Sequence, residues 1–149
     1  MGFLHSPLQI RHSYAIFAHM DDKKTVMIVE DEADAAELFA EMMRVGGFRV
    51  LKYFSSGPAI PAIEHEKPDV VILDVMMPDI SGLEVLRYMR RQPNLASIPV
   101  IVVSAKSMPM DIKIGLDAGA SMYLTKPVGY RDLIQAVDQV LQGSDAPQI

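Results

Sequence analysis

The sequence predicts an α/β domain whose parallel sheet is covered by helices on both faces. From Lys23 onward, short apolar segments of strand length alternate with longer segments that have helical periodicity. The strand-like segments, above all Val70–Leu73, are apolar throughout instead of alternating with polar residues, which indicates burial on both faces of the sheet. Right-handed crossovers between parallel strands place helices on each side, so five strands alternating with five helices favour this class.

The elements follow one another in a regular order. The predicted strands are 25–29, 49–54, 70–73, 98–103 and 121–124. The predicted helices are 32–45, 55–66, 81–91, 109–118 and 130–141. Each predicted strand is thus followed by a predicted helix.

The first two helices differ in the strength of their signals. Within 32–45, apolar residues recur at helical spacing, and two glycines after the segment supply its stop; the apolar residues are Ala35, Leu38, Met42 and Val45. Helix 55–66 contains two prolines. Pro58 suits a first turn, but Pro61 removes a further hydrogen-bond donor, so we expect this helix to be short or distorted.

The other three helices have clearer boundaries. Ser81 is a plausible N-cap for helix 81–91, which should turn Leu83, Leu86 and Met89 inward. The helix at 109–118 ends at a glycine. Helix 130–141 also stops at a glycine, and it should bury Leu133, Ile134, Val137, Val140 and Leu141.

Composition bounds the domain organisation and the class of protein. The chain has 149 residues, 50% of them hydrophobic, which suits one domain with a real core at 23–142. Residues 1–22 lack periodicity, so we expect a poorly ordered arm or an appended extension, and 143–149 is expected to be a C-terminal tail.

A net charge of −5 argues against a protein that binds mainly to nucleic-acid phosphate backbones. The lack of cysteine excludes disulfide scaffolds and thiolate metal sites, and with no membrane-length apolar run we expect a cytoplasmic protein.

Chemically competent side chains follow four of the five predicted strands. Glu30 and Asp31 follow the first strand, Asp74 the third, Ser104 the fourth and Lys126 the fifth. In a parallel α/β sheet the working site lies beyond the carboxyl ends of the strands, so these side chains should meet there. Carboxylates that lie close together repel one another unless a cation intervenes, and oxygen ligands suit Mg²⁺.

This set of groups suits phosphoryl transfer to a carboxylate. Asp74 ends the most apolar strand and is the better nucleophile candidate, since an attack on phosphorus would give an aspartyl phosphate. Glu30 and Asp31 suit the metal, and Lys126 can neutralise charge on the phosphoryl oxygens. Taken singly, each residue is more often a helix cap, a turn residue or a solvated lysine. Independent caps, however, have no reason to occupy the ends of four different strands.

The same residues resemble the receiver domain of two-component response regulators, in particular the single-domain, chemotaxis-regulator-like kind. The resemblance covers about residues 23–141. It is carried by VEDE at 29–32, DVMMPDISG at 74–82, VSA at 103–105, AGA at 118–120 and YLTKP at 123–127. It implies a flavodoxin-like doubly wound fold with the five-stranded order 2-1-3-4-5.

The resemblance also implies a role for each site residue. Asp74 would take the phosphoryl group from the phosphohistidine of a sensor histidine kinase or phosphotransfer protein. Mg²⁺ would be held by Glu30, Asp31, Asp74 and the backbone carbonyl of Met76. Ser104 and Lys126 would bind the phosphoryl group, and Tyr123 would be the aromatic switch that turns inward when Ser104 moves.

Two positions depart from the pattern of similar receivers. Met76 and Lys106 lie two residues after Asp74 and Ser104, where similar receivers tune the loss of the phosphoryl group. Since the Met76 side chain cannot orient an attacking water, we expect a comparatively long-lived aspartyl phosphate.

The resemblance implies output through protein contact. We expect a protein partner at the face formed by helix 109–118, strand 121–124 and helix 130–141, no direct nucleic-acid or membrane contact, and a monomer or weak dimer. A stand-alone receiver and one excised from a longer regulator both fit.

Other function classes remain open at this point. We expect only self-phosphorylation and slow autodephosphorylation, so we do not expect the chain to be an enzyme. An aspartyl-phosphate phosphatase would need a second aspartate where Met76 stands, to act as general acid. A nucleotide binder would need a glycine-rich loop after the first strand, where acidic residues stand instead. A receiver-like scaffold that is never phosphorylated is the remaining alternative.

Overall fold

The computed structural model describes residues 22–143. The predictions for the N-terminal arm and the C-terminal tail fall, apart from Asp22 and Gly143, outside these residues. The strands are β1 (Thr25–Val29), β2 (Arg49–Tyr53), β3 (Val70–Leu73), β4 (Val100–Ser104) and β5 (Met122–Thr125). The helices are α2 (Ala33–Val45), α3 (Ser56–Glu66), α4 (Gly82–Arg91), α5 (Pro109–Asp117) and α6 (Tyr130–Leu141).

The strands form one parallel sheet in the order β2-β1-β3-β4-β5. In the register, Ile28 of β1 pairs with Lys52 on one side and with Ile72 on the other. At the β5 edge, Ser104 of β4 pairs with Thr125. The carboxyl ends of the strands therefore lie along one edge of the sheet. The predicted α/β fold and strand order are confirmed.

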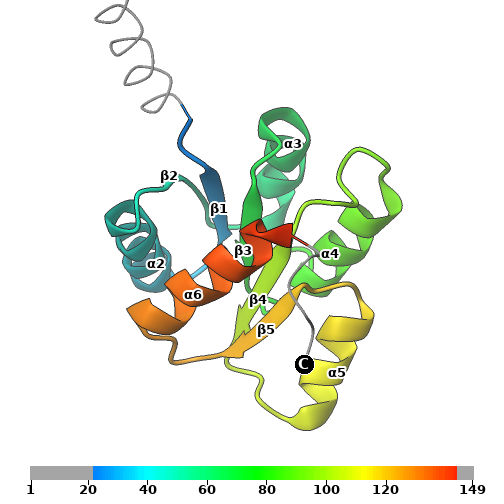
Figure 1. Ribbon diagram of the computed structural model, residues 1–149. Coiled ribbons are helices and arrows are strands. Elements are labelled where there is room, and N and C mark those ends of the chain that lie inside the picture. Colours follow the sequence, from blue (N-terminus) through cyan, green and yellow to red (C-terminus); the bar gives the residue numbers. More distant parts are fainter. Residues whose placement is uncertain (1–21, 144–149) are drawn as a thin grey trace, which may run out of the picture.

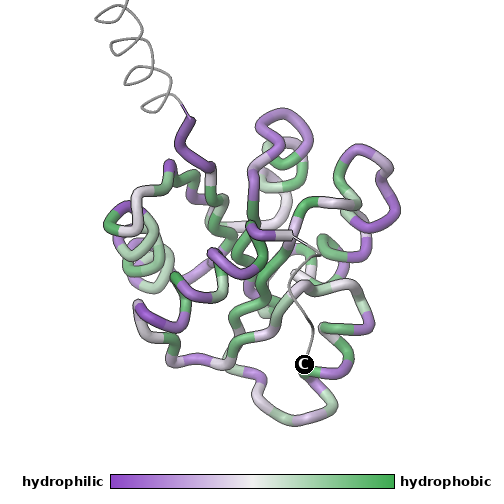
Figure 2. The backbone as a smooth tube through the Cα atoms, in the orientation of Figure 1, coloured by the Kyte–Doolittle hydropathy of each residue, from purple (hydrophilic) through white to green (hydrophobic). Residues whose placement is uncertain are grey.

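Helices cover both faces of the sheet (Figure 1). On one face α2 and α6 enclose a core that includes Ile28, Phe39 and Leu133, and on the other α3 and α4 enclose a core that includes Met27 and Leu86. In β3 and β4 every residue is buried, as the continuous apolar runs predicted. Figure 2 shows the apolar residues gathered on the central strands and on the inner sides of the helices.

The inward face of α2 differs from the expected one. The helix has the predicted extent, but its buried residues are Ala36, Phe39, Ala40 and Met43. Leu38 and Val45, which the spacing argument selected, are 55% and 72% exposed. The chain carries two overlapping apolar stripes here. The stripe with Phe39 packs inward because its aromatic ring buries more apolar surface.

Helix α3 is longer than its prolines suggested. It runs without interruption from Ser56 to Glu66, with Pro61 inside it and Ala59 and Ile63 buried. Burial of these two side chains against the sheet holds the helix in place despite the missing N–H of Pro61. The expectation of a short helix was therefore wrong.

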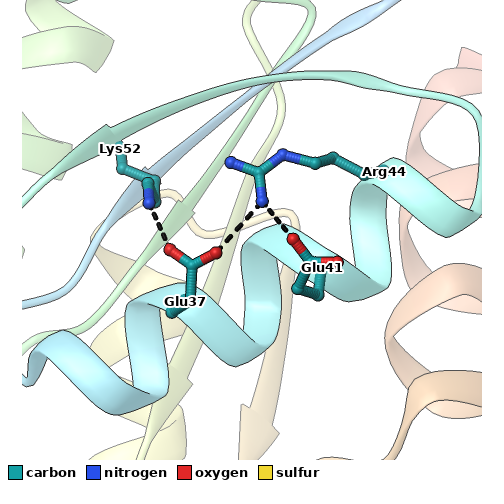
Figure 3. A network of polar contacts seen from close by, with 4 residues as sticks. All are labelled: Glu37, Glu41, Arg44 and Lys52. Carbon is teal, nitrogen blue, oxygen red and sulfur yellow. Dashed lines mark hydrogen bonds and ion pairs between the residues drawn. The ribbon is translucent and has the colours of Figure 1, made fainter.

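An ion-pair network joins α2 to the edge strand β2 (Figure 3). The Glu37 carboxylate accepts hydrogen bonds from Lys52 of β2 and from Arg44, which also donates to Glu41. The hydrogen bonds from Lys52 and Arg44 lower the pKa of Glu37. Since these side chains are largely exposed, the network is screened by salt and stabilises the edge only weakly.

Among the described helices, none combines the length and apolar character that a membrane crossing requires.

Candidate functional site

The predicted site residues lie together at the carboxyl edge of the sheet. Glu30 follows β1 and Asp74 follows β3, the two neighbouring strands at the centre of the sheet. Glu30 is 1% exposed and Asp74 6% exposed, whereas Asp31 is exposed. Carboxylate oxygens of these three residues lie within 4.8 Å of one another. The β-strands therefore bring two buried carboxylates and one exposed carboxylate into a single acidic cluster.

Lys126 reaches into this cluster from the end of β5. Its Nζ donates to Asp74 Oδ2 at 2.9 Å and also donates to Glu30 Oε1. The Lys126 side chain is 20% exposed. Burial opposes its charge, but the hydrogen bonds to Glu30 and Asp74 outweigh burial and raise the pKa of Lys126. One ammonium group thus neutralises part of the charge of two buried carboxylates.

Glu30 is the electrostatically least satisfied member of the cluster. Burial raises its pKa from 4.5 to about 7, against the opposing hydrogen bond from Lys126, and Asp74 adds to the rise. Its second oxygen, Oε2, is buried and has no hydrogen-bond partner among the described residues. A buried carboxylate oxygen without a partner costs free energy unless a cation or a donor reaches it.

The donor set fits a hard divalent cation. Three carboxylates offer oxygen ligands, and the charge of Lys126 is too small to balance them. The unpartnered Oε2 of Glu30 is an oxygen that such an ion would satisfy. Asp74 itself is held by its neighbour, since Oδ1 accepts the backbone N–H of Met76 at 2.9 Å. The Met76 side chain is 51% exposed beside the cluster.

Ser104 and Tyr123 are connected through the backbone of a residue between them. Ser104 Oγ accepts the N–H of Lys106 at 3.2 Å, and the Tyr123 hydroxyl donates to the carbonyl of the same Lys106 at 2.7 Å. The N–H of Lys126 donates to the Ser104 carbonyl at 2.9 Å, which fixes β5 beside β4 at the site. The fully buried Ser104 is thereby joined to both Lys126 and Tyr123.

The Tyr123 ring occupies a space that a glycine leaves open. A Cβ on Gly115 of α5 would lie 2.7 Å from Tyr123 Cδ2, which is closer than such atoms approach. Tyr123 and Lys106 also line a pocket of about 100 Å³ together with Val75 and Leu83. The position of the ring thus depends on α5 as well as on β5.

Sequence reasoning did not predict the contacts that three positions make around the site, although it had named Lys106 for another reason. The backbone of Lys106 carries the contact between Ser104 and Tyr123, and backbone contacts leave no mark on residue type. Gly115 did leave a signal, because a glycine inside a helix costs about 0.5–1 kcal/mol and so needs a reason. Asp79 lies within the DVMMPDISG segment, but its contact with α3 depends on the fold.

Comparison with known proteins agrees with this architecture. The family model described as the response regulator receiver domain matches residues 26–138. The phosphate regulon transcriptional regulatory protein PhoB of Pseudomonas aeruginosa is 35% identical over 119 residues, which are 80% of this chain and 52% of PhoB. Protein PilH of the same organism is 34% identical over 118 residues, which cover 79% of this chain and 98% of PilH.

Solved structures agree as well. The receiver domain of the Francisella response regulator 1452 has a TM-score of 0.76 and 28% identity, with 80% of this chain and 98% of that chain covered. The chain spans about half the length of most of the curated relatives it matches, and nearly all of PilH. The family match covers most of the chain, and the sheet order and acidic edge derived above agree with it. The chain therefore belongs to the receiver domains of response regulators in two-component signalling.

Proposed function

We propose that Asp74 is the phosphoacceptor of this receiver and that its phosphorylation changes a protein-binding surface. The observation that carries the proposal is the acidic cluster itself. Asp74 is buried beside Glu30, lies near Asp31, and accepts a hydrogen bond from Lys126. A carboxylate so placed has an ammonium group and further carboxylate oxygens beside it, which are the groups that support an attack on phosphorus.

The phosphodonor is the phosphohistidine of a sensor histidine kinase or of a phosphotransfer protein. An oxygen of the Asp74 carboxylate forms the new bond to phosphorus. The bond between phosphorus and the imidazole nitrogen breaks, and its electron pair stays on that nitrogen. Lys126 already donates a hydrogen bond to Asp74, so it needs little rearrangement to reach an oxygen of the transferred group. There its ammonium group balances the charge of the phosphoryl oxygens.

Glu30, Asp31 and Asp74, with the backbone carbonyl of Met76, are the residues that would hold Mg²⁺. When bound, the ion supplies positive charge against the phosphoryl oxygens. Glu30 and Asp31 would contribute oxygen ligands, while Lys126 and the Met76 N–H hold the Asp74 carboxylate in a defined position. The raised pKa of Glu30 and its unpartnered Oε2 support a cation at this place.

Ser104 and Tyr123 are proposed to transmit the phosphorylation of Asp74 to the protein-binding surface. A phosphoryl group adds about −1.5 to −2 charges and three acceptor oxygens, which would draw in the Ser104 hydroxyl. That hydroxyl at present accepts the Lys106 N–H, so its movement alters the loop whose carbonyl holds Tyr123. The response requires two loop arrangements of similar energy, since a ligand shifts populations only by differential affinity.

The surface that responds is the face of α5, β5 and α6. Met108 and Met110, at the start of α5, are 67% and 64% exposed and suit an adaptable apolar contact with a downstream protein. We propose that output runs through this contact, without nucleic acid or membrane, in a cytoplasmic monomer or weak dimer. The only chemistry proposed is self-phosphorylation and slow autodephosphorylation.

The deciding experiment is phosphorylation with acetyl phosphate or a histidine kinase, with and without Mg²⁺. Intact-protein mass spectrometry should detect one phosphoryl group on the wild type, dependent on Mg²⁺ and labile to base, and none on Asp74→Asn. Glu37→Gln, which removes an exposed carboxylate of α2 that is not part of the acidic cluster, should label like the wild type. Label that persists on Asp74→Asn would place the acceptor elsewhere. A wild type that takes no label from either donor would favour the non-phosphorylated scaffold.

A further inference from the structure

The loop between β3 and α4 begins at Asp74, and a second acidic residue anchors it to another helix. Asp79 lies near the end of this loop. Its Oδ1 accepts the backbone N–H of Ser56 at 3.1 Å, and its Oδ2 accepts the N–H of Gly57 at 2.8 Å. Ser56 and Gly57 are the first two residues of α3. One carboxylate thus binds two N–H groups that the helix cannot pair within itself.

The contact replaces a missing local cap. Ser55, the N-cap residue of α3, makes no side-chain cap hydrogen bond. The role that a neighbouring serine or aspartate usually plays is taken by Asp79, more than twenty residues further along the chain. The backbone N–H of Gly57, followed by that of Ser56, outweighs the effect of burial and lowers the pKa of Asp79. The carboxylate therefore remains charged at neutral pH.

A second hydrogen bond runs between the same two segments in the opposite direction. The Ser56 hydroxyl donates to the carbonyl of Ile80 at 2.6 Å, and Ser56 is fully buried. The loop and the start of α3 therefore share three hydrogen bonds, two from the helix backbone to Asp79 and one from the helix side chain to Ile80. A shift of the loop would leave the buried Ser56 hydroxyl without this acceptor.

The two ends of the loop lie in close contact at its base. A Cβ on Gly82 would lie 2.1 Å from the Asp74 carbonyl oxygen, so the two ends of the loop touch. The Gly82 N–H donates to the Val75 carbonyl at 3.1 Å. Between its ends, the loop is held at two places: the Met76 N–H donates to Asp74 at the acidic cluster, and Asp79 and Ile80 accept the hydrogen bonds from α3.

We propose that Asp79 is a positioning residue that holds the β3–α4 loop, and with it the Met76 backbone, in place for the metal. The part concerning the metal depends on the function proposed above, because it assigns the Met76 carbonyl to Mg²⁺. The part concerning the loop does not depend on it. Among the described residues, the hydrogen bonds of the Asp79 side chain go to α3 and not to the acidic cluster, so Asp79 acts through the loop.

The test compares wild type, Asp79→Ala and Asp79→Asn with a matched control. Asp111→Ala is that control, because Asp111 also receives a backbone N–H at a helix start, from Met108 at 3.2 Å, but lies outside this loop. Amide hydrogen exchange is measured on the metal-free proteins, and Mg²⁺ affinity by isothermal titration calorimetry. Circular dichroism first establishes the temperature at which all four proteins are folded.

We expect exchange in the peptides covering residues 75–82 to accelerate about tenfold in Asp79→Ala, the scale of lost charge-assisted hydrogen bonds. The Mg²⁺ dissociation constant should rise several-fold in the same protein. Asp79→Asn, which keeps one acceptor oxygen, should fall between Asp79→Ala and wild type in both measurements. Asp111→Ala should match the wild type in both.

Unchanged exchange of this loop in Asp79→Ala would overturn the proposal entirely. Faster exchange with an unchanged Mg²⁺ affinity would overturn the part that concerns the metal. If the wild type accepts no phosphoryl group while Asp79→Ala still shows faster exchange and weaker Mg²⁺ binding, the proposed function fails and the positioning role stands.

Discussion

Lys126 Nζ lies 2.9 Å from Asp74 Oδ2 and donates to Glu30 at the same time, so one ammonium group is shared by two buried carboxylates. The two carboxylates come from adjacent central strands, whereas the lysine comes from the edge strand β5. The site is therefore held together across the width of the sheet by charge. This arrangement makes the metal-free protein sensitive to the loss of a single cation.

Lys126→Met should lower the free energy of unfolding of the metal-free protein by about 3 kcal/mol, because it leaves buried carboxylates without their counter-charge. Urea unfolding at neutral pH measures the change. Adding Glu30→Gln to the same protein should restore part of the loss, since it removes one of the unpaired charges. Lys113→Met, which breaks an exposed ion pair with Asp117, should change little. Equal stability of Lys126→Met and wild type would contradict the shared-charge account.

The contact between Gly115 and Tyr123 predicts that Gly115→Ala changes stability in opposite directions with and without the Tyr123 ring. Gly115→Ala should destabilise the wild type by about 1 kcal/mol or more, because the new Cβ overlaps the Tyr123 ring. In a Tyr123→Ala background the same change should instead stabilise by about 0.5–1 kcal/mol, the usual gain of alanine over glycine in a helix. Urea unfolding of the wild type, the two single variants and the double variant gives the four free energies of this double-mutant cycle. Stabilisation in both backgrounds would show that the ring does not need the glycine.

The Asp79 contact predicts a pH dependence. Its pKa is lower in the folded protein than the ordinary value of 3.8, so its hydrogen bonds to α3 stabilise the fold above that value. The contribution is lost as pH falls through the folded-state pKa. The difference in urea midpoint between wild type and Asp79→Ala should therefore be constant near pH 6 and shrink below about pH 3.8. A difference that stays the same down to acidic pH would mean that the Asp79 charge is not involved.

Met76 predicts the lifetime of the phosphorylated state. Its side chain is exposed beside the acidic cluster but has no group that orients water for attack on phosphorus. Met76→Asn should speed the loss of the phosphoryl group by about tenfold, which is about 1.4 kcal/mol of activation free energy. The decay is followed by mass spectrometry after removal of the phosphodonor. Slower decay in Met76→Asn than in wild type would refute the expectation of a long-lived phosphoryl group.

Much of the fold could be predicted because the strongest signals in this sequence come from burial on both faces of a sheet. β3 and β4 are continuously apolar, and no other environment suits such short runs between helices. The inward face of α2 could not be predicted with the same security, since two apolar stripes overlap there. The structure buries the stripe that contains Phe39, whose ring buries more apolar surface, and leaves Leu38 exposed.

The acidic cluster could be predicted from topology, because residues after parallel strands must meet at one edge. That rule places Glu30, Asp74 and Lys126 together without any knowledge of their contacts. It does not reveal which side chains hold the surrounding loops. Asp79 reaches the start of a helix, more than twenty residues earlier in the chain, and only the packed structure brings the two together.

The backbone of Lys106 has a further consequence. Both of its polar atoms are engaged, the nitrogen with Ser104 and the oxygen with Tyr123, while its side chain extends from the surface. In the proposed switch, Lys106 therefore acts through its backbone atoms and not through its side chain. A replacement of the side chain alone leaves both backbone groups available, whereas proline, which has no N–H to give, would remove the hydrogen bond to Ser104.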